Sequence, residues 1–285
     1  MSGRTKTKVS APVRALQRSE GELRLEFRRR GPASVLGGLY QSGCLKARLP
    51  RGRGTAPEAV CINTSGGLTD GDRLCTTVTC HTGAAAIVSG QAAERIYRSR
   101  GDKARIESTL VLEAESMLAW LPQEMIVFDG GRVSRQLDVR MSASAHLLAV
   151  EASILGRTAM GEVVVSGSLD ERWHVDIDGE PVYIDALCLE GDDLASFRQR
   201  DAILRGALAF ATVLFAGNDA ARIRDAVGRM GSIVDVEIGT SLIGPVLVTR
   251  MAAASGLGLR TALIRIISMI SGQYDDLHLP KVWTL

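Results

Sequence analysis

The sequence lacks any apolar run of about 18 residues, which is the length that a helix needs to cross a bilayer. Near its start it also lacks the short apolar segment that directs a chain to secretion. Lysine and arginine number 34 and aspartate and glutamate 32, so the formal net charge is only +2. We therefore expect a protein that has neither a membrane nor a nucleic acid as its partner.

Cysteine is scarce, and its spacing suits neither disulfides nor a zinc finger. The five residues form an odd, scattered set that fits a reducing cytoplasm, where we place the protein: Cys44, Cys61, Cys75, Cys80 and Cys188. Cys80 and His81 are adjacent, so in a strand they would point to opposite faces. A buried, structural Cys80 is therefore favoured over a metal ligand.

Sequence signatures of catalysis are also absent. The chain contains no Gly-Lys-Ser or Gly-Lys-Thr of a phosphate-binding loop and no G-x-S-x-G nucleophile turn. An enzyme with Cys75 or Cys80 as its nucleophile is an alternative for which the residues offer no support. We therefore expect a protein that binds or assembles other molecules and is not an enzyme.

What the sequence does contain, from about residue 20 to 190, is a series of short segments with the alternation of β-strands. They recur every 8–12 residues with almost no helical periodicity, which predicts a layered or coiled all-β architecture. The expected strands are residues 22–27, 59–62, two within 74–89 that meet at 81–83, 105–112, 117–120, 125–128, 133–141, 145–152, 163–165, 172–177 and 181–187. Loops are expected where Gly37 and Gly38 break the chain and at 50–57, and a hairpin turn at Asp178-Gly179.

The last third is different, because it contains the helical spacing. Residues 201–215 and 219–230 are rich in alanine and predict helices, while 234–238 and 245–249 predict strands. Residues 257–270 predict an amphipathic helix whose stripe includes Leu259, Leu263, Ile266 and Ile270. This stripe either caps the sheet or docks on a partner. We expect a flexible start at 1–20 and one domain over 21–285.

A glycine-rich turn at residues 65–72, SGGLTDGD, follows a short apolar run. Gly66, Gly67 and Gly71 are expected to be structural, because glycine readily takes a positive φ or allows a close backbone approach. The turn is expected to place Asp72 inside the protein.

The segment that follows, residues 91–99, is too polar for an ordinary core strand. Glu94, Arg95, Tyr97 and Arg98 lie here, and in a strand they would point to both faces. We expect Arg95 or Arg98 to pair with a buried carboxylate such as Asp72 or Glu124. A solvated edge strand is the alternative.

These stretches resemble motifs of the urease accessory protein family UreD, also called UreH. NTSGGLTDGDRL (63–74) is similar to the family's N-T-A-G-G-L-x-x-G-D-R-L, and QAAERIYRS (91–99) is similar to its A-A-E-K-I-Y-R-S. WLPQEMIVFD (120–129), LGRTAMGE (155–162), the stretch 172–187 and LPKVW (279–283) follow in the same order as in the family. The resemblance covers the chain from about residue 22 to its last residues.

The resemblance implies a non-catalytic role in the maturation of urease, a nickel enzyme. Members of the family form a complex with UreF and the GTPase UreG on the urease apoprotein, and the complex delivers nickel to the active site. The implied fold is mostly β, with helically wound, layered sheets and a few helices concentrated in the C-terminal third. An internal tunnel has been proposed for the family as the route of the metal.

From this resemblance we expect no tightly bound cofactor but transient contact with Ni²⁺. The expected weak sites are Asp72, Glu94 and Glu162, because Ni²⁺ accepts and exchanges oxygen ligands. The alternative for Asp72 is that it caps the turn or pairs with an arginine. UreF is expected to bind the stripe of residues 259–270. The alternative function is a pure scaffold that reshapes urease and recruits UreF without passing nickel.

Overall fold

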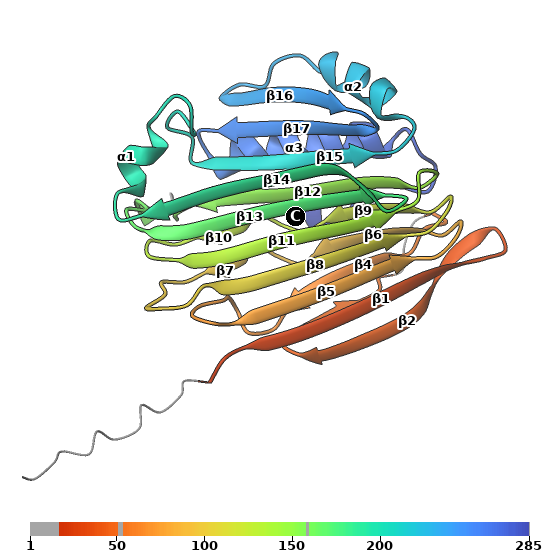
Figure 1. Cartoon of the computed structure of the whole chain (residues 1–285), viewed down its shortest axis with the longest axis horizontal. Helices are drawn as coiled ribbons and strands as arrows, with labels where there is room; N and C mark the ends of the chain where they lie inside the picture. The colour runs from red at the N-terminus through yellow and green to blue at the C-terminus, as the bar shows by residue number, and fades with distance from the viewer. Residues whose placement is uncertain (1–16, 51–53, 158–159, 285) are drawn as a thin grey trace, which may run out of the picture.

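The computed structural model describes residues 17–50, 54–157 and 160–284 and consists mostly of β-strands in two stacked sheets (Figure 1). The expectation of a mostly β, helically wound fold is confirmed. The first sheet has the order β14-β13-β11-β8-β5-β1-β2. Its strands are β1 (Glu20–Arg30), β2 (Ala33–Gly43), β5 (Arg73–Cys80), β8 (Ala104–Leu112), β11 (Arg132–Met141), β13 (Gly167–Ile177) and β14 (Glu180–Gly191).

The second sheet faces the first and has the order β16-β17-β15-β12-β9-β6-β4-β3. Short strands β7 and β10 pair with each other, and β10 also pairs with β12. The bounds are β3 (Leu45–Arg48), β4 (Glu58–Asn63), β6 (Ala85–Gly90), β7 (Glu94–Ile96), β9 (Met117–Leu121), β10 (Met125–Val127), β12 (His146–Leu155), β15 (Ala209–Ala216), β16 (Val236–Ile243) and β17 (Val246–Ala253).

From β4 to β13 the chain winds as a solenoid. It crosses from one sheet to the other, so β5, β8, β11 and β13 pair in parallel in the first sheet, as β4, β6, β9 and β12 do in the second. Antiparallel strands close the ends, among them the β13–β14 hairpin. Its turn has positive φ at Asp178 (52°) and Gly179 (84°), which confirms the expected hairpin turn.

Most expected strands are present, but three local expectations are wrong. Residues 163–165 form no strand, because the Asp129 carboxylate accepts hydrogen bonds from the N–H groups of Val165 and Ser166 (2.9 and 3.0 Å) that a neighbouring strand would otherwise bind. Gly37 and Gly38 do not break the chain but lie inside β2. The predicted helix at 201–215 is instead a turn followed by β15.

Strand β15 was mistaken for a helix because all eight of its side chains are buried. A strand covered on both faces is apolar throughout and shows no alternation, so a short alanine-rich run can be read either way. The helices of this region are α1 (Leu194–Arg198), α2 (Ala220–Gly228) and α3 (Gly256–Ser271), followed by the 3-10 turn η2 (Lys281–Trp283). The expected helices at 219–230 and 257–270 are confirmed.

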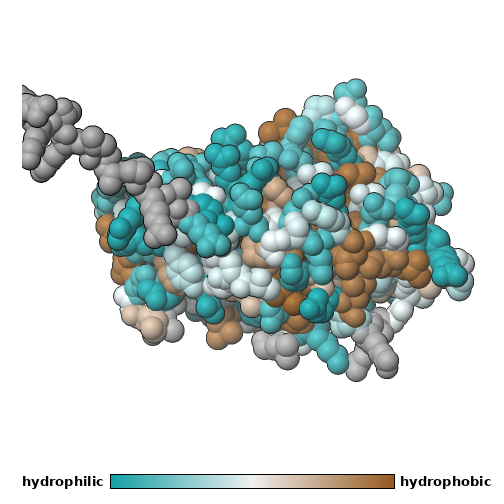
Figure 2. All heavy atoms as spheres, turned by 90° about the horizontal axis from the view of Figure 1, so that it is seen from below, coloured by the Kyte–Doolittle hydropathy of each residue, from teal (hydrophilic) through white to brown (hydrophobic). Residues whose placement is uncertain are grey.

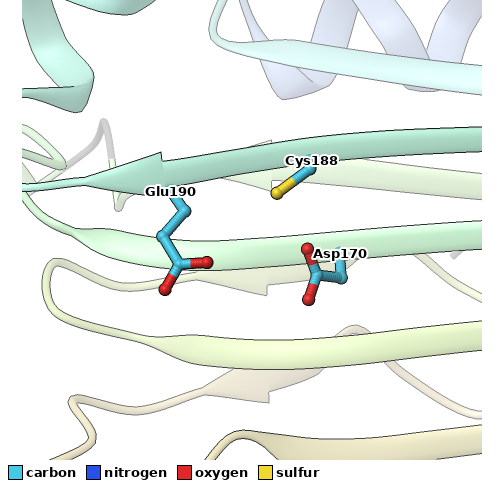
Figure 3. Close-up of side chains that lie close together, drawn as sticks. All are labelled: Asp170, Cys188 and Glu190. Carbon is cyan, nitrogen blue, oxygen red and sulfur yellow. The ribbon is translucent and has the colours of Figure 1, made fainter.

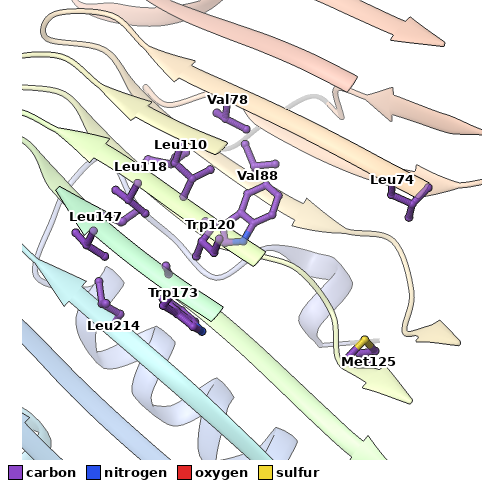
Figure 4. Packing of buried hydrophobic residues seen from close by; sticks show 14 of the residues in the cluster. Leu74, Val78, Val88, Leu110, Leu118, Trp120, Met125, Leu147, Trp173 and Leu214 are labelled. Carbon is purple, nitrogen blue, oxygen red and sulfur yellow. The ribbon is translucent and has the colours of Figure 1, made fainter. Parts of the chain in front are cut away.

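The core has two parts, one on each face of the second sheet. Between the sheets, side chains such as Leu110, Leu118 and Trp173 interdigitate (Figure 4). On the outer face, α2, α3 and Trp283 cover the alternate side chains of the same strands. Leu147 and Leu148, neighbours in β12, belong one to each part, which explains why apolar residues of 145–152 occupy consecutive positions and do not alternate with polar ones.

The stripe on α3 lies in this outer part of the core. Leu259, Leu263 and Ile266 are 0% exposed and Ile270 is 1% exposed, so α3 caps the chain's own sheet. The expectation that these four side chains form a surface for UreF is therefore corrected, since burial of each contributes about 1.5–3 kcal/mol to folding instead. No helix in the described ranges has the length and apolarity to span a membrane.

The structure tests the predicted loop at 50–57 and the predicted flexible start at 1–20 only in part. β3 ends at Arg48 and β4 begins at Glu58, as the expected loop at 50–57 requires, although residues 51–53 lie outside the described residues. Residues 1–16 of the expected flexible start lie outside them too, and β1 already begins at Glu20.

Candidate functional site

The glycine turn adopts the backbone that the sequence predicts. Gly66, Gly67 and Gly71 have φ of 80°, 148° and 69°, and Asp72 is only 4% exposed. One carboxylate oxygen of Asp72 accepts the N–H of Ser19 at 2.7 Å and the other accepts the N–H of Thr69 at 2.8 Å. Both oxygens are therefore bound to backbone, which is the capping arrangement weighed as the alternative for this residue.

Gly67 joins the turn to the segment around β7. A Cβ at this position would lie 2.5 Å from the ring of Tyr97 and 2.9 Å from the carbonyl oxygen of Arg95. The next residue, Leu68, donates its N–H to that carbonyl at 2.7 Å and accepts the N–H of Tyr97 at 2.8 Å. Two of the sequence motifs are thus one structural unit, which only glycine at position 67 allows.

The polar segment pairs differently from the expectation. Arg98 forms its ion pair with Asp129, a half-buried residue, and not with Asp72 or Glu124. Glu124 pairs with Arg260, while Arg95 is exposed. The expected pairing with a buried carboxylate is therefore wrong, because the coil of the solenoid brings the FDGG stretch, 30 residues on, beside Arg98.

A cavity of about 240 Å³ opens between the sheets next to these motifs. Its wall includes Asn63, Glu94, Trp120, Gln123 and, at its inner end, the side chains of Arg135 and Glu151. We call it the first cavity. Of the three carboxylates expected to contact nickel, Glu94 is the one that lines it; Asp72 and Glu162 do not.

Glu94 is held at the cavity wall by hydrogen bonds. The side-chain amide of Asn63 donates to both carboxylate oxygens, at 3.0 and 3.1 Å. Burial raises the pKa of Glu94, and the bonds from Asn63 act in the opposite direction. Burial also raises the pKa of the neighbouring Cys61 to about 12, so this thiol is neutral at physiological pH and a poor metal ligand.

The inner end of the first cavity is a buried ionic cluster that sequence reasoning missed. Arg135 on β11 lies between Glu151 on β12 and Glu171 on β13. Its Nε is 3.2 Å from Glu151, its Nη2 binds Glu171, and the hydroxyl of Ser153 donates to Glu171 at 2.6 Å. Each of the three charged side chains is at most 8% exposed. We call these residues, with Ser153, the central cluster.

Burial dominates the electrostatics of the central cluster. It raises the pKa of Glu151 to about 7, with Arg135 opposing the rise and Glu171 adding to it. Burial alone would lower the pKa of Arg135, but its two carboxylate partners raise it. A signal was available in the sequence: Glu151 is a lone charge in the apolar run 145–155, and a charge there must find a buried partner.

A second cavity, of about 410 Å³, reaches the central cluster from the other side. Strands β13 to β17 line it, with Glu171, Trp173, Asp185 and Arg250 among its side chains. The first cavity is lined mainly from β4 to β10, so the central cluster forms the wall between the two. Both cavities are lined by strands of both sheets, so they lie between the sheets.

Glu162 has a different environment. Its carboxylate receives two hydrogen bonds from the Arg157 guanidinium, each 3.0 Å long, which lowers the pKa of Glu162. The guanidinium carbon lies 4.3 Å from the centre of the Phe128 ring. The LGRTAMGE and FDGG stretches are therefore joined by packing and by an ion pair on the surface.

In the described residues, one group brings three possible metal-binding atoms within 4.8 Å of one another: Asp170, Cys188 and Glu190 (Figure 3). The ammonium of Lys103 lies among them, 2.6 Å from Asp170 and 3.2 Å from Glu190. A hydrogen bond to Asp170 raises the pKa of the exposed Cys188 thiol. The Lys103 ammonium therefore already neutralises the two carboxylates, and the Cys188 thiol is a weak metal ligand.

The surface has apolar side chains at scattered positions. Met160, Val234 and Leu257 are 74%, 84% and 77% exposed. Figure 2 shows one face, on which apolar residues gather over part of an otherwise mixed surface. Leu257 is in the first turn of α3, so that helix presents an exposed apolar side chain although its stripe is buried.

Comparison with known proteins agrees with the motifs. A family model described as "UreD urease accessory protein" matches residues 19–284. A protein of Chelativorans sp. (strain BNC1) named "Urease accessory protein UreD" is 42% identical over 272 residues, 95% of each chain. "Urease accessory protein UreD 1" of Brucella abortus biovar 1 is 40% identical over 275 residues, 95% of this chain and 96% of that one. The chain therefore belongs to the UreD family of urease accessory proteins.

Proposed function

We propose that this protein delivers nickel to urease as a non-catalytic accessory protein, and that the ion passes between the two β-sheets through the first cavity. The observation that carries the proposal is the position of two carboxylates that line the first cavity: Glu94, which is partly buried, and Glu151, which is 3% exposed. Burial raises the pKa of both carboxylates more than Arg135 and Asn63 lower it, and titratable groups perturbed in this way inside a cavity are candidates for a functional site.

The chemistry of the cavity suits a passing ion better than a resident one. Carboxylate and carbonyl oxygens bind Ni²⁺ and exchange it, whereas thiolates and imidazoles hold it far more tightly. Cys61 also lines the cavity, but burial keeps its thiol protonated. Glu94 and Glu151 therefore offer weak oxygen ligands at two successive points along the wall.

The partners we propose are those that the resemblance to the family implies. UreF, UreG and the urease apoprotein would assemble with this chain in the cytoplasm, so that nickel leaves the GTPase side and enters urease without mixing with solvent. Since the apolar stripe of α3 is buried, a contact of this helix with UreF would use exposed positions such as Leu257.

A pure scaffold remains the second candidate function, because one observation favours it. Arg135 fills the wall between the two cavities, and a cation cannot pass while the guanidinium stays there. Under the scaffold function the cavities are packing imperfections and the chain acts only by recruiting UreF and reshaping urease.

Isosteric replacement of the two carboxylates separates these functions. Glu94→Gln and Glu151→Gln keep the shape of the side chain and remove its charge, and Arg135 still pairs with Glu171 in the second variant. Glu162→Gln, outside the cavity, is the matched control. Each variant would be purified in complex with UreF, UreG and urease apoprotein, and the nickel content of the matured urease measured.

On the delivery proposal, the two cavity variants assemble normally and yield urease whose nickel content, at limiting nickel, is about tenfold or more below that of the control, since losing even an outer-shell partner of a metal ligand costs about 10–100-fold in metal affinity. Full nickel content with Glu151→Gln in an intact complex would refute passage along this route and leave the scaffold function.

A further inference from the structure

The positively charged guanidinium of Arg135 lies between two carboxylates, where a metal ion could otherwise bind. Besides Glu151 and Glu171, it contacts the hydroxyl of Ser153 at 3.0 Å and the carbonyl oxygen of Ala152 at 3.4 Å. Four oxygen-bearing groups, two carboxylates, a hydroxyl and a carbonyl, thus converge on one positive group in a region where each side chain is at most 8% exposed. Such a hard oxygen set is the kind that a small divalent cation binds.

One half of this cluster is poorly satisfied. The Arg135 Nε and the Glu151 Oε2 are 3.2 Å apart, yet their geometry is not that of a hydrogen bond, and neither atom has another partner among the described residues. Buried polar atoms are normally bonded, so an unsatisfied pair needs an explanation. Glu151 also lines the first cavity, so a cation there could reach it.

We propose that Arg135 is a built-in, displaceable cation, and that Glu151, Glu171 and Ser153 form a divalent-cation site when the guanidinium moves aside. The role of this site in urease maturation rests on the proposed nickel route, in which it is the gate between the two cavities. The site itself belongs to the chain alone and is testable there.

Charge balance explains why the site is closed at rest. Two buried carboxylates with no counter-ion repel each other, and the guanidinium removes most of that repulsion. A divalent ion beside Glu151 would repel the guanidinium and take its place, so the carboxylates exchange one cation for another and are never left bare. Arg135 lines the first cavity, which offers space for the long side chain to move into.

The experiment removes the built-in cation and measures whether a metal ion replaces it. The full chain carrying Arg135→Gln would be dialysed against Ni²⁺ alone, and bound nickel determined by atomic emission and by calorimetry. Two controls accompany it: Arg135→Lys, which keeps the positive charge, and Arg135→Gln with Glu151→Gln, which removes one ligand.

The expected result is that Arg135→Gln binds about one Ni²⁺ per chain at least tenfold more tightly than the unaltered protein or Arg135→Lys, and that the added Glu151→Gln change abolishes the gain. If Arg135→Gln is unfolded without metal, added Ni²⁺ is expected to restore its folded state, because the ion replaces the missing charge. Nickel binding no tighter than in the unaltered protein, or an unfolded variant that millimolar Ni²⁺ does not rescue, would overturn the proposal.

This test and the test of the proposed function fail in different ways. A gain of nickel by Arg135→Gln together with fully loaded urease from Glu151→Gln keeps the cation site and removes it from the delivery route. No gain by Arg135→Gln together with nickel-poor urease from Glu151→Gln overturns the gate and keeps the route.

Discussion

The contact of Gly67 with the β7 segment supports a quantitative prediction. In Gly67→Ala, the new Cβ would lie 2.5 Å from the Tyr97 ring and 2.9 Å from the Arg95 carbonyl oxygen, where ordinary contact begins near 3.4 Å. The φ of 148° adds a conformational penalty, since side chains rarely adopt it. The steric clash and the conformational penalty can be measured separately, because Gly66 in the same turn has a positive φ but no close contact.

That control is Gly66→Ala. Its φ is 80°, and a Cβ there would meet nothing within 4 Å. The left-handed backbone alone is expected to lower the free energy of unfolding by about 1–2 kcal/mol. Gly67→Ala adds an overpacking term of about 1–3 kcal/mol, because the Arg95 carbonyl is fixed by its bond to Leu68. The sum is about 2–5 kcal/mol for position 67.

Denaturant unfolding of the two variants and the unaltered protein measures this difference. A double-mutant cycle with Tyr97→Ala isolates the steric part, because Gly67→Ala should be less destabilising by about 1 kcal/mol or more when the ring is absent. Equal destabilisation by Gly66→Ala and Gly67→Ala, or a cycle with no coupling, would show that close approach is not what position 67 requires.

Three further outcomes follow from the described contacts. Asp72→Ala should lower the free energy of unfolding by about 1–3 kcal/mol by freeing two backbone N–H groups, while urease matured with the folded variant keeps its nickel; nickel-poor urease from a fully assembled complex would contradict this. Leu263→Asp should abolish folding, as soluble yield and circular dichroism would show, and a folded variant that has merely lost UreF binding would contradict burial of α3. Trp283→Phe should destabilise by about 1 kcal/mol in thermal unfolding, because the indole N–H donates to the Leu121 carbonyl at 3.1 Å; an unchanged midpoint would rule out that bond as a contributor.

Local patterns allowed most of the strands to be predicted. Alternation in β1, β8 and β11 follows directly from one buried and one exposed face. The prediction failed at β15, whose two faces are both covered, and at β2, whose glycines pack beneath the side chains of Glu26 and Arg28 on β1. In both places the neighbouring elements, and not the local sequence, decided the conformation.

The glycine turn was predictable because its requirements are local. Positive φ at Gly66 and Gly71 needs no partner, and one of the two hydrogen bonds to Asp72 comes from Thr69, three residues earlier; the other, from Ser19, is not local. The partner of Arg98 was not predictable, since Asp129 is 31 residues away and reaches it only through one turn of the solenoid.

The central cluster shows most clearly which features the sequence determines and which features only the tertiary structure decides. The sequence alone determined that Glu151 lies in an apolar strand, that the chain is mostly β, and that its ordered motifs are those of the UreD family. Only the tertiary structure decided that Arg135, Glu151 and Glu171 meet, because they lie on β11, β12 and β13, which the winding places in facing sheets. Pairing of buried charges depends on distances across the core, and a linear sequence does not contain them.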